Sequence, residues 1–286
     1  MAYYLLDPLQ LKEYGKSFFE GDEFSYRYQF SKRLFWQSIY IPWGPVCKSR
    51  QGFDNFLNHI SNIKFSHVIV ELPVIYSSET EKDVANGLIS NGFEKLSYTL
   101  QSNETLLAFK DSFHLSSAKM NKVRAGKKHV DVEVKSQLTE DEVDEIYDVY
   151  KIAIARLDSK LVDRSVFSAL SKNCLVAFAR NKETKKLEGY TLGYFTDIGP
   201  SNYSDKPYNR AMVVVYTGLT DEGRDHRLGH CMHYDLFTTA FDLYDTDIIN
   251  FHGASRTKNH TFLPFKLDFT DHFHELPGCY NKRRWF

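Results

Sequence analysis

The chain has 286 residues, with 36 Lys and Arg against 37 Asp and Glu, so its formal net charge is −1. At about 150 residues per domain, this length predicts two domains. The balanced charge excludes a broadly basic nucleic-acid-binding face and an acidic tail, so an anionic partner must be held by a local basic cluster. Hydrophobic residues make up 42% and charged residues 26%, which is typical of a globular protein and excludes a disordered or collagen-like chain.

The four cysteines, at positions 47, 174, 231 and 279, lie far apart and form no C-x-x-C pair. This spacing excludes a zinc ribbon and a redox-active dithiol, so we expect reduced thiols. The first residues have no basic flank before an apolar stretch, and the apolar runs at 68–70 and 212–216 have the length of strands. The sequence therefore predicts a cytoplasmic protein without a transmembrane helix.

Strands and helices alternate in the first part of the chain. Apolar residues at helical spacing predict helices from about 53 to 63 and from 79 to 90, and Asn91-Gly92 ends the second one. Four segments are rich in aromatic and β-branched residues, as strands are: 23–30, 34–41, 67–72 and 104–109. The alternation predicts an α/β layer.

The second part begins with the alternating strand 130–134 and a helix from Thr139 to about 157, where Thr139 and Glu142 form a capping box. Asp163 is placed to cap a further helix. The remaining predicted elements are strands 174–179, 189–196 and 211–218, helix 225–244, and strands 247–251 and 273–280. A polar segment at about 111–130 separates the two parts, so we predict two modules, residues 1–115 and 116–286.

The element order of the second module, strand, two helices, three-stranded meander, helix and strand, is that of the GNAT acyltransferase fold. In this fold a splayed strand exposes backbone amides to an acyl carbonyl, and the next helix directs its N–H groups at phosphates. Arg224 and Arg227 near the start of that helix suit an anionic group; alternatively, they are solvated charges at a helix end. The usual coenzyme A loop is matched only at Gly229.

Short motifs then indicate a narrower family. Residues 39–46, Ile-Tyr-Ile-Pro-Trp-Gly-Pro-Val, resemble the "lpyGPv" signature of the Fem-type (FemABX) aminoacyltransferases, which are tandem GNAT folds. Residues 120–130 are similar to the family's basic run between modules, residues 252–254 to its "d-x-G-G" strand end, and residues 265–269, Phe-Lys-Leu-Asp-Phe, to its C-terminal F-K-x-x-F/L motif. The resemblance implies an α/β fold with mixed sheets, built as two GNAT-like modules. The N-terminal part is shorter than is usual in the family, so we expect the first module to be abbreviated.

The same resemblance implies an acyltransferase that takes an amino acid from the acceptor end of an aminoacyl-tRNA. The amino acid would form a peptide bond with an amine of a peptidoglycan precursor or related peptide. The resemblance implies no cofactor, no DNA partner, and peripheral contact with a membrane where the substrate is lipid-linked.

Position by position, Lys266 matches the family's functional lysine, which stabilises the charge that develops on the attacked ester carbonyl. The residues implied in substrate binding are Phe265, Trp43, Gly44, Arg124, Lys127, Lys128, Arg224 and Arg227. Phe109 departs from the family pattern, because it stands where a carboxylate is expected, so an acidic general base is missing there.

Two alternative functions stay open. One is a CoA-dependent GNAT N-acyltransferase, which would transfer the acyl group of acetyl-CoA or another acyl-CoA to a small-molecule or peptide amine. The other is a catalytically silent GNAT-like binding module.

A metal site is a further hypothesis from the sequence, because His226, His230 and His233 stand at i, i+4 and i+7. Three histidines on one helix lie in a line rather than around a point, and no H-E-x-x-H carboxylate accompanies them. We therefore interpret them as helix-surface or core residues and predict no metal. The sequence also has no G-x-S-x-G elbow, which argues against a serine hydrolase.

Overall fold

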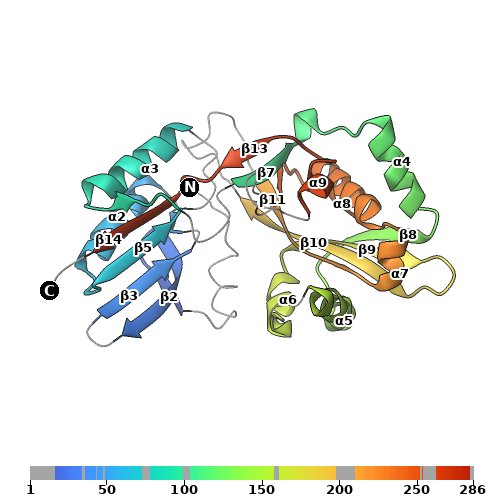
Figure 1. The fold of residues 1–286 in the computed structure, drawn as a ribbon, viewed down its shortest axis with the longest axis horizontal. Helices are drawn as coiled ribbons and strands as arrows, with labels where there is room; N and C mark the ends of the chain where they lie inside the picture. Colours follow the sequence, from blue (N-terminus) through green and yellow to red (C-terminus); the bar gives the residue numbers. More distant parts are fainter. Residues whose placement is uncertain are drawn as a thin grey trace.

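A computed structural model of the chain describes ten segments: residues 17–33, 36–42, 44–47, 49–72, 78–98, 104–157, 161–197, 210–251, 253 and 262–283. Their strands form two seven-stranded sheets, both with parallel and antiparallel neighbours, flanked by helices (Figure 1). This confirms the predicted fold class, a mixed α/β protein with mixed sheets.

The first sheet is built mainly from the N-terminal part of the chain. Its strands, in spatial order, are β1 (Ser17–Glu20), β2 (Phe24–Arg33), β3 (Trp36–Ile41), β5 (His67–Glu71), β14 (Cys279–Arg283) and β6 (Glu94–Lys95), with β4 (Val46–Cys47) paired to β2. The helices that the structure describes in this half are α2 (Arg50–Asn62) and α3 (Ser78–Ser90).

The predicted helix starts and stops of the first half have clear local causes. The Ser49 side chain accepts a hydrogen bond of 3.0 Å from the backbone N–H of Gly52 and caps α2. Phe53, Phe56 and Ile60 lie on one side of α2 and are completely buried. After α3 the chain turns at Gly92, whose φ of 79° is in the left-handed region that glycine adopts without strain.

The second sheet has the order β13-β7-β12-β11-β10-β9-β8. Its strands are β7 (Glu104–Phe109), β8 (Val130–Ser136), β9 (Cys174–Asn181), β10 (Leu187–Asp197), β11 (Arg210–Leu219), β12 (Ile248–Asn250) and β13 (Phe273–Glu275). The helices of this half are α4 (Ser117–Gly126), α5 (Glu140–Arg156), α6 (Arg164–Leu170), α7 (Asp221–Asp225), α8 (Gly229–Leu243) and α9 (Leu263–Lys266), and a 3₁₀ turn, η1, spans Lys110–Ser112. In Figure 1, α4 and α8 cover one face of the sheet and α5 and α6 the other.

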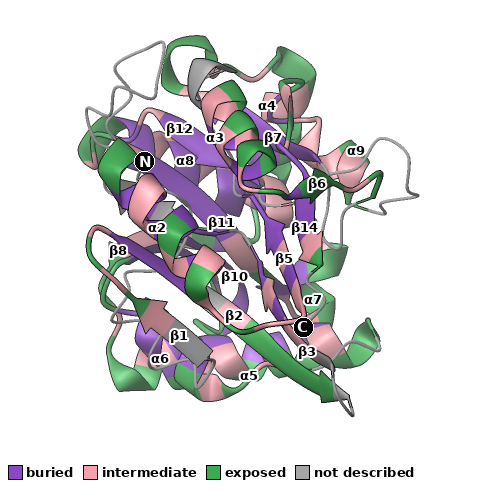
Figure 2. Ribbon diagram, turned by 90° about the vertical axis from the view of Figure 1, so that its left-hand side faces the viewer, coloured by how far each residue is buried: buried purple, intermediate pink, exposed green. Residues whose placement is uncertain are grey.

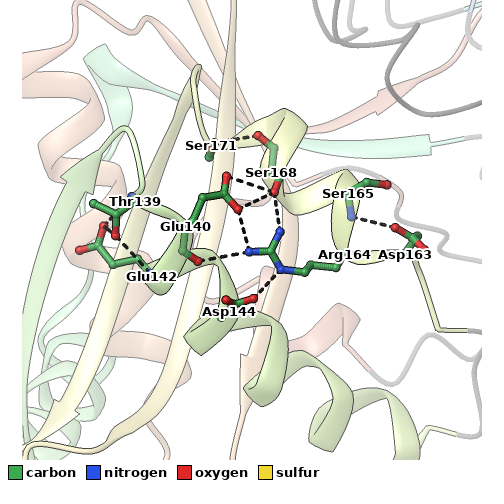
Figure 3. Close-up of polar contacts among 9 residues, drawn as sticks. All are labelled: Thr139, Glu140, Glu142, Asp144, Asp163, Arg164, Ser165, Ser168 and Ser171. Atoms are coloured by element: carbon green, nitrogen blue, oxygen red, sulfur yellow. Dashed lines mark hydrogen bonds and ion pairs between the residues drawn. The ribbon is translucent and has the colours of Figure 1, made fainter.

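Polar contacts fix the start of α5 and the α5–α6 pair, as Figure 3 shows. The predicted capping box is present, because the Thr139 side chain accepts from the N–H of Glu142 and the Glu142 carboxylate accepts from the N–H of Thr139. Asp163 caps α6, as predicted. The Arg164 guanidinium then binds Glu140, at 2.7 Å, and Asp144 on α5. These contacts hold α5 and α6, which are consecutive in the chain, together at the surface.

Two strands are exchanged between the halves of the chain. Strand β7 precedes residue 115 but lies in the second sheet, whereas β14, at residues 279–283, lies between β5 and β6 in the first sheet. The dark red β14 is seen beside the cyan β5 in Figure 1. The sheets therefore do not coincide with the ranges 1–115 and 116–286, and the division into those two modules stays a prediction.

One apolar core spans both halves. Its buried members include Phe56, Val70 and Tyr280 from the first sheet region and Phe167 and Tyr190 from the second. A separate cluster fills the space between the second sheet and α4 and α8. In Figure 2 the strands are mostly buried, and green exposed stretches mark the outer sides of the helices.

The structure also corrects two predicted elements. The single strand predicted at 273–280 is two strands, β13 and β14, in different sheets. The single helix predicted at 225–244 is α8 alone, preceded by a short α7, because Arg227 has a φ of 56°, outside the right-handed helical region, and so interrupts the helix. No helix among the described residues combines the length and the apolar character needed to cross a bilayer. The cytoplasmic location stays a prediction.

Candidate active site

The second sheet opens between its two parallel strands. β11 and β12 are paired from Ala211↔Ile248 to Val213↔Asn250, and β11 then continues to Leu219 without β12 beside it. The N–H of Phe251 donates to Leu106 on β7 at 3.0 Å, so the chain after β12 stays with β7 and leaves β11. On its other side β11 carries a β-bulge, since its register with β10 skips Val215.

A cavity of about 860 Å³ lies at this opening. Its walls come from the free length of β11, the second half of α5, the start of α8 and the segment around α9. The lining residues include Thr217, Arg224, Arg227, Gly229, His230, His233, Phe265 and Lys266. Most of the remaining lining is apolar, for example Ile154 and Val214, and Arg156 also lines the cavity.

Lys266 is the last residue of α9, and its ammonium reaches back to the segment after β12. Its Nζ donates to the carbonyl oxygens of Phe251, at 2.9 Å, and Gly253, at 2.5 Å. Burial lowers the pKa of Lys266 to about 8, so the side chain is mainly protonated at neutral pH. The cavity therefore contains a cation that the backbone holds in place.

Phe265, next to Lys266, packs against the first turns of α8. Its ring lies 4.9 Å from the rings of both His230 and His233, edge to face in each case. At Gly229 an added Cβ would come within 3.1 Å of the Phe265 ring. A glycine at the start of α8 thus lets the aromatic ring approach the helix closely.

Arg224 and Arg227 line the same cavity and are exposed. Within the described part of the chain neither guanidinium has an ion pair or a hydrogen-bond partner. Arginine guanidinium groups bind phosphate and carboxylate groups through paired N–H donors, and the start of α8 adds a partial positive charge. This edge of the cavity suits an anionic group.

The three histidines of the predicted metal pattern have separate partners. His226 contacts Glu188 at 2.9 Å, and His233 contacts the carbonyl oxygen of Gly229 at 2.8 Å. Burial lowers the pKa of His233 to about 3, so this ring is neutral. Across the described residues no group of three or more His, Cys, Asp and Glu side chains could hold a metal ion.

His230 and Asp268 form a pair that the sequence analysis did not predict. Nε2 of His230 lies 2.8 Å from Oδ2 of Asp268, and the same oxygen accepts from Lys122 Nζ at 2.5 Å. Burial raises the pKa of Asp268, but the bonds from Lys122 and His230 outweigh it and hold that pKa below its usual value. Asp268 is a variable position of the F-K-x-x-F motif, so only its charge beside Lys266 could have indicated it.

Four predicted binding residues do not line the cavity. Gly44 is buried in the first sheet region, where its N–H donates to the carbonyl oxygen of Glu71 at 3.1 Å. On α4 and the turn after it, Arg124 contacts Asn121 at 3.1 Å, Lys127 contacts Asp235 at 2.7 Å, and Lys128 is exposed. The structure thus brings Phe265, Lys266, Arg224 and Arg227 together and places the other four elsewhere; all these roles stay predictions.

Three further residues belong to the segments that resemble the family's motifs: Trp43, His252 and Phe109. Trp43 and His252 lie outside the described residues. Phe109 ends β7 and packs edge to face on His272, with ring centroids 5.4 Å apart. An aromatic side chain therefore occupies the position where the family pattern has a carboxylate.

The two mixed sheets, the divergent parallel pair and the helix that follows it define a tandem GNAT-like fold. Solved structures confirm this class. FemX matches with 13% identity and a TM-score of 0.68, over 92% of this chain and 85% of that one. L-PGS from Bacillus licheniformis matches with 13% identity and a TM-score of 0.66, over 96% of this chain and 86% of that one.

A third solved structure, the C-terminal domain of a protein described as a lysylphosphatidylglycerol synthetase from Agrobacterium fabrum, has 13% identity and a TM-score of 0.63. The alignment covers 95% of this chain and 85% of that one. No protein-family profile and no curated protein matches the sequence. The Fem-like GNAT fold implied by the short motifs is therefore confirmed by similarity in structure.

Proposed function

We propose that the protein transfers an amino acid from an aminoacyl-tRNA to an amine of a peptidoglycan precursor, forming a peptide bond. The observation that carries this proposal is the position of Lys266. The lysine of the F-K-x-x-F motif lies in the cavity between β11 and β12, where this fold exposes strand backbone to an acyl group. The alternative of a silent binding module does not account for a half-buried cation held at that position.

The chemistry needs a positive group at the attacked carbonyl. When an amine attacks an aminoacyl ester, the carbonyl oxygen becomes an oxyanion, and a fixed donor that is complementary to this charge lowers the barrier. The Lys266 ammonium meets this requirement because two carbonyl oxygens fix its position and its pKa of about 8 keeps it charged at neutral pH. Phe265 beside it supplies an apolar wall.

The donor end of the substrate would be held by Arg224 and Arg227. The 3′ end of a tRNA carries phosphates close to the aminoacyl ester, and both guanidinium groups are free to bind them at the cavity edge. A balanced overall charge of −1 gives no broad attraction to RNA, so the affinity would depend on such local contacts. The proposal assigns Arg124, Lys127 and Lys128 at most an outer contact with the tRNA.

The names of the fold neighbours support aminoacyl transfer more than they support a particular acceptor. A lysylphosphatidylglycerol synthetase joins an amino acid to a lipid, and FemX shares the same fold with 13% identity to this chain. We infer aminoacyl transfer as the common reaction class and take the peptide amine as the acceptor from the motif resemblance. The assay therefore has to distinguish a peptide amine from a lipid as the acceptor.

The test is a transfer assay with purified protein, tRNA charged with a mixture of radiolabelled amino acids, and a UDP-linked muramyl pentapeptide as the acceptor. We expect label to reach the peptide amine only when charged tRNA is present. Parallel reactions contain radiolabelled acetyl-CoA with the same peptide, or charged tRNA with phosphatidylglycerol vesicles. Transfer from acetyl-CoA alone would contradict aminoacyl-tRNA as the donor, and transfer to the lipid would contradict a peptide amine as the acceptor. No transfer at all would contradict the proposal that the protein is an enzyme.

A further inference from the structure

The proposed reaction needs a proton acceptor that the family pattern no longer provides. Phe109 replaces the expected carboxylate, and no Asp or Glu is among the described residues that line the cavity. We propose that His230, oriented by Asp268, accepts the proton of the attacking amine; this role rests on the proposed aminoacyl transfer. Lys266 would then stabilise the negative carbonyl oxygen, and His230 would take the proton of the amine that attacks the same carbonyl group.

The hydrogen bond to Asp268 determines which nitrogen of His230 is available. Nε2 lies 2.8 Å from a carboxylate oxygen that also binds Lys122, and such an oxygen only accepts. The proton of the neutral ring is therefore on Nε2, and the lone pair is on Nδ1. Within the described residues no group is bonded to Nδ1. His230 lines the cavity, so Nδ1 is the ring atom left to accept a proton.

The ring cannot easily turn away from this orientation. Phe265 meets it edge to face at 4.9 Å, and Phe269 stacks on it at 5.7 Å. Lys119 adds a bond from its Nζ to the carbonyl oxygen of Leu267 at 3.1 Å, which fixes the turn that carries Asp268 to α4. A base held by its neighbours loses little entropy when the substrate arrives.

The other two histidines of the same stretch lack one requirement each. His233 lines the cavity, but its Nδ1 faces the carbonyl of Gly229 and burial lowers its pKa to about 3, so it is a weak base. His226 has a carboxylate partner, Glu188, but it does not line the cavity. Only His230 combines a carboxylate partner with a place in the cavity wall.

The charges around His230 fit a base that works near neutral pH. Burial lowers its pKa below the usual value, while the bond and charge of Asp268 oppose that change and Lys122 on α4 adds to it. Lys266 lines the same cavity, and the neighbouring His233 is neutral. His230 is therefore unprotonated at pH 7, and the imidazolium that forms in the reaction is stabilised by Asp268, as in other His–carboxylate pairs.

The proposed step is balanced without a further reactant. The lone pair of the amine attacks the ester carbonyl carbon, so a C–N bond forms while the carbonyl oxygen becomes negative beside Lys266. His230 Nδ1 takes one N–H proton from the amine. When the C–O bond to the tRNA ribose breaks, the same proton goes to the leaving ribose oxygen, and the neutral ring is restored.

His230→Gln and His226→Gln form a matched pair of variants, since both remove a histidine from a His–carboxylate contact. In the transfer assay we expect His230→Gln to lower kcat by about 100-fold, the usual worth of a general base, and to leave KM for charged tRNA unchanged. We expect His226→Gln to keep the wild-type kcat. Equal rates for both variants and the wild type would overturn the role of His230 but leave the proposed function standing.

The pH profile separates a base from a merely structural residue. Below the pKa of His230, which burial lowers from the usual 6.5, both the substrate amine and His230 must lose a proton, so log kcat/KM of the wild type should rise with a slope of two. In His230→Gln the slope should be one. An unchanged slope of two in that variant would overturn the proposal, even if its kcat is low.

A readout without substrate tests Asp268 as the positioning residue. Long-range ¹H–¹⁵N NMR of the histidine rings at pH 7 should show His230 protonated on Nε2 and bare on Nδ1, and Asp268→Asn should shift this tautomer. A protonated Nδ1 in the wild type would overturn the proposal whatever the assay gives. If the expected tautomer is present but the wild type transfers no amino acid, the proposed function fails and the catalytic role of His230 fails with it.

Discussion

Among the described strands, each of the two sheets contains one parallel pair, β3–β5 in the first and β11–β12 in the second, and only the second of these pairs opens. In the first sheet β3 and β5 are paired from Ser38↔His67 to Ile41↔Val70, the end of β3, and the N–H of Gly44 then donates to Glu71. In the second sheet β11 and β12 share three residue pairs, after which β11 continues alone to Leu219. The same arrangement is closed in one half and open in the other.

This difference explains where the cavity and its cation lie. The bond from Gly44 to Glu71 continues the β3–β5 contact past the last paired residues, so these two described segments stay together there. Past β12 the chain bonds β7 instead, and the gap is lined by Lys266, Thr217 and the start of α8. The residues proposed to act in the reaction therefore lie in the second half, and the first half shares an apolar core with it.

The largest effect is expected where the halves share one core. Tyr280 on β14 is 1% exposed and belongs to the cluster that also contains Phe167. We expect Tyr280→Ala to lower the free energy of unfolding by about 3–5 kcal/mol, as the removal of a buried aromatic ring does. The exposed Tyr98 is the control, and Tyr98→Ala should change stability by less than about 0.5 kcal/mol.

Urea unfolding of Tyr280→Ala, followed by circular dichroism and by aromatic fluorescence, gives the measurement. Because the core is continuous, both signals should shift together in one transition. Two separate transitions in the variant would show that the halves unfold independently and that the shared cluster does not couple them.

Removing a lysine in each half compares the open region with the closed one. Nζ of Lys266 and of Lys282 both donate to backbone carbonyls, the latter to Asn91 in the first half. We expect Lys266→Met to lower kcat by about 10²–10³-fold, the cost of losing one oxyanion donor, and Lys282→Met to leave it unchanged. Equal losses of activity in the two variants, at equal folded fractions, would place the active region elsewhere.

Each half also has a histidine whose pKa burial lowers, the half-buried His59 in the first and the buried His233 in the second. The unfolded chain binds a proton on His233 below about 6.5, but the folded protein does so only near 3, so stability falls as the pH falls through this range. At pH 5 the loss is about 2 kcal/mol.

His233→Asn removes this titration while an amide can still donate to Gly229. We expect urea unfolding at pH 7 and at pH 5 to show a smaller loss of stability in the variant than in the wild type, by about 2 kcal/mol. An identical loss in both proteins would mean that His233 is not held neutral by burial.

The smallest effect concerns a helix glycine beside a phenylalanine ring in each half. A Cβ at Gly229 would lie 3.1 Å from Phe265, and one at Gly87 would lie 2.7 Å from Phe53. We expect Gly229→Ala to lower kcat/KM by about two- to fivefold, because Phe265 and the adjacent Lys266 must shift slightly. Gly87→Ala should lower only the melting temperature. The reverse result, a loss of transfer in Gly87→Ala alone, would contradict the division between the two halves.

Local signals in the sequence predicted the helices and strands that have local causes. The capping box of Thr139 and Glu142, the cap at Asp163 and the stop at Gly92 are formed by neighbouring residues, so they could be predicted from the chain itself. The exchange of β7 and β14 could not, because strand pairing across more than a hundred residues leaves no periodic signal.

The same distinction holds for the site. The motif at residues 265–269 and the arginines near the start of the helix after β11 were predicted, and the structure brings Phe265, Lys266 and the two arginines to one cavity. Asp268 was missed because its role depends on contacts with Lys122 and His230 from distant elements. The predicted strand at 273–280 was wrong because Gly278, with a φ of 104°, separates two strands that belong to different sheets.

The place of β14 has a consequence for the order in which the chain folds. During synthesis from the N-terminus, β5 emerges with one edge open, and among the described strands β6 has no partner other than β14. The first sheet therefore stays incomplete until residues 279–283 have left the ribosome, long after its other strands. In that interval an apolar strand edge is exposed to other nascent chains, so truncated products that lack β14 would be prone to aggregate.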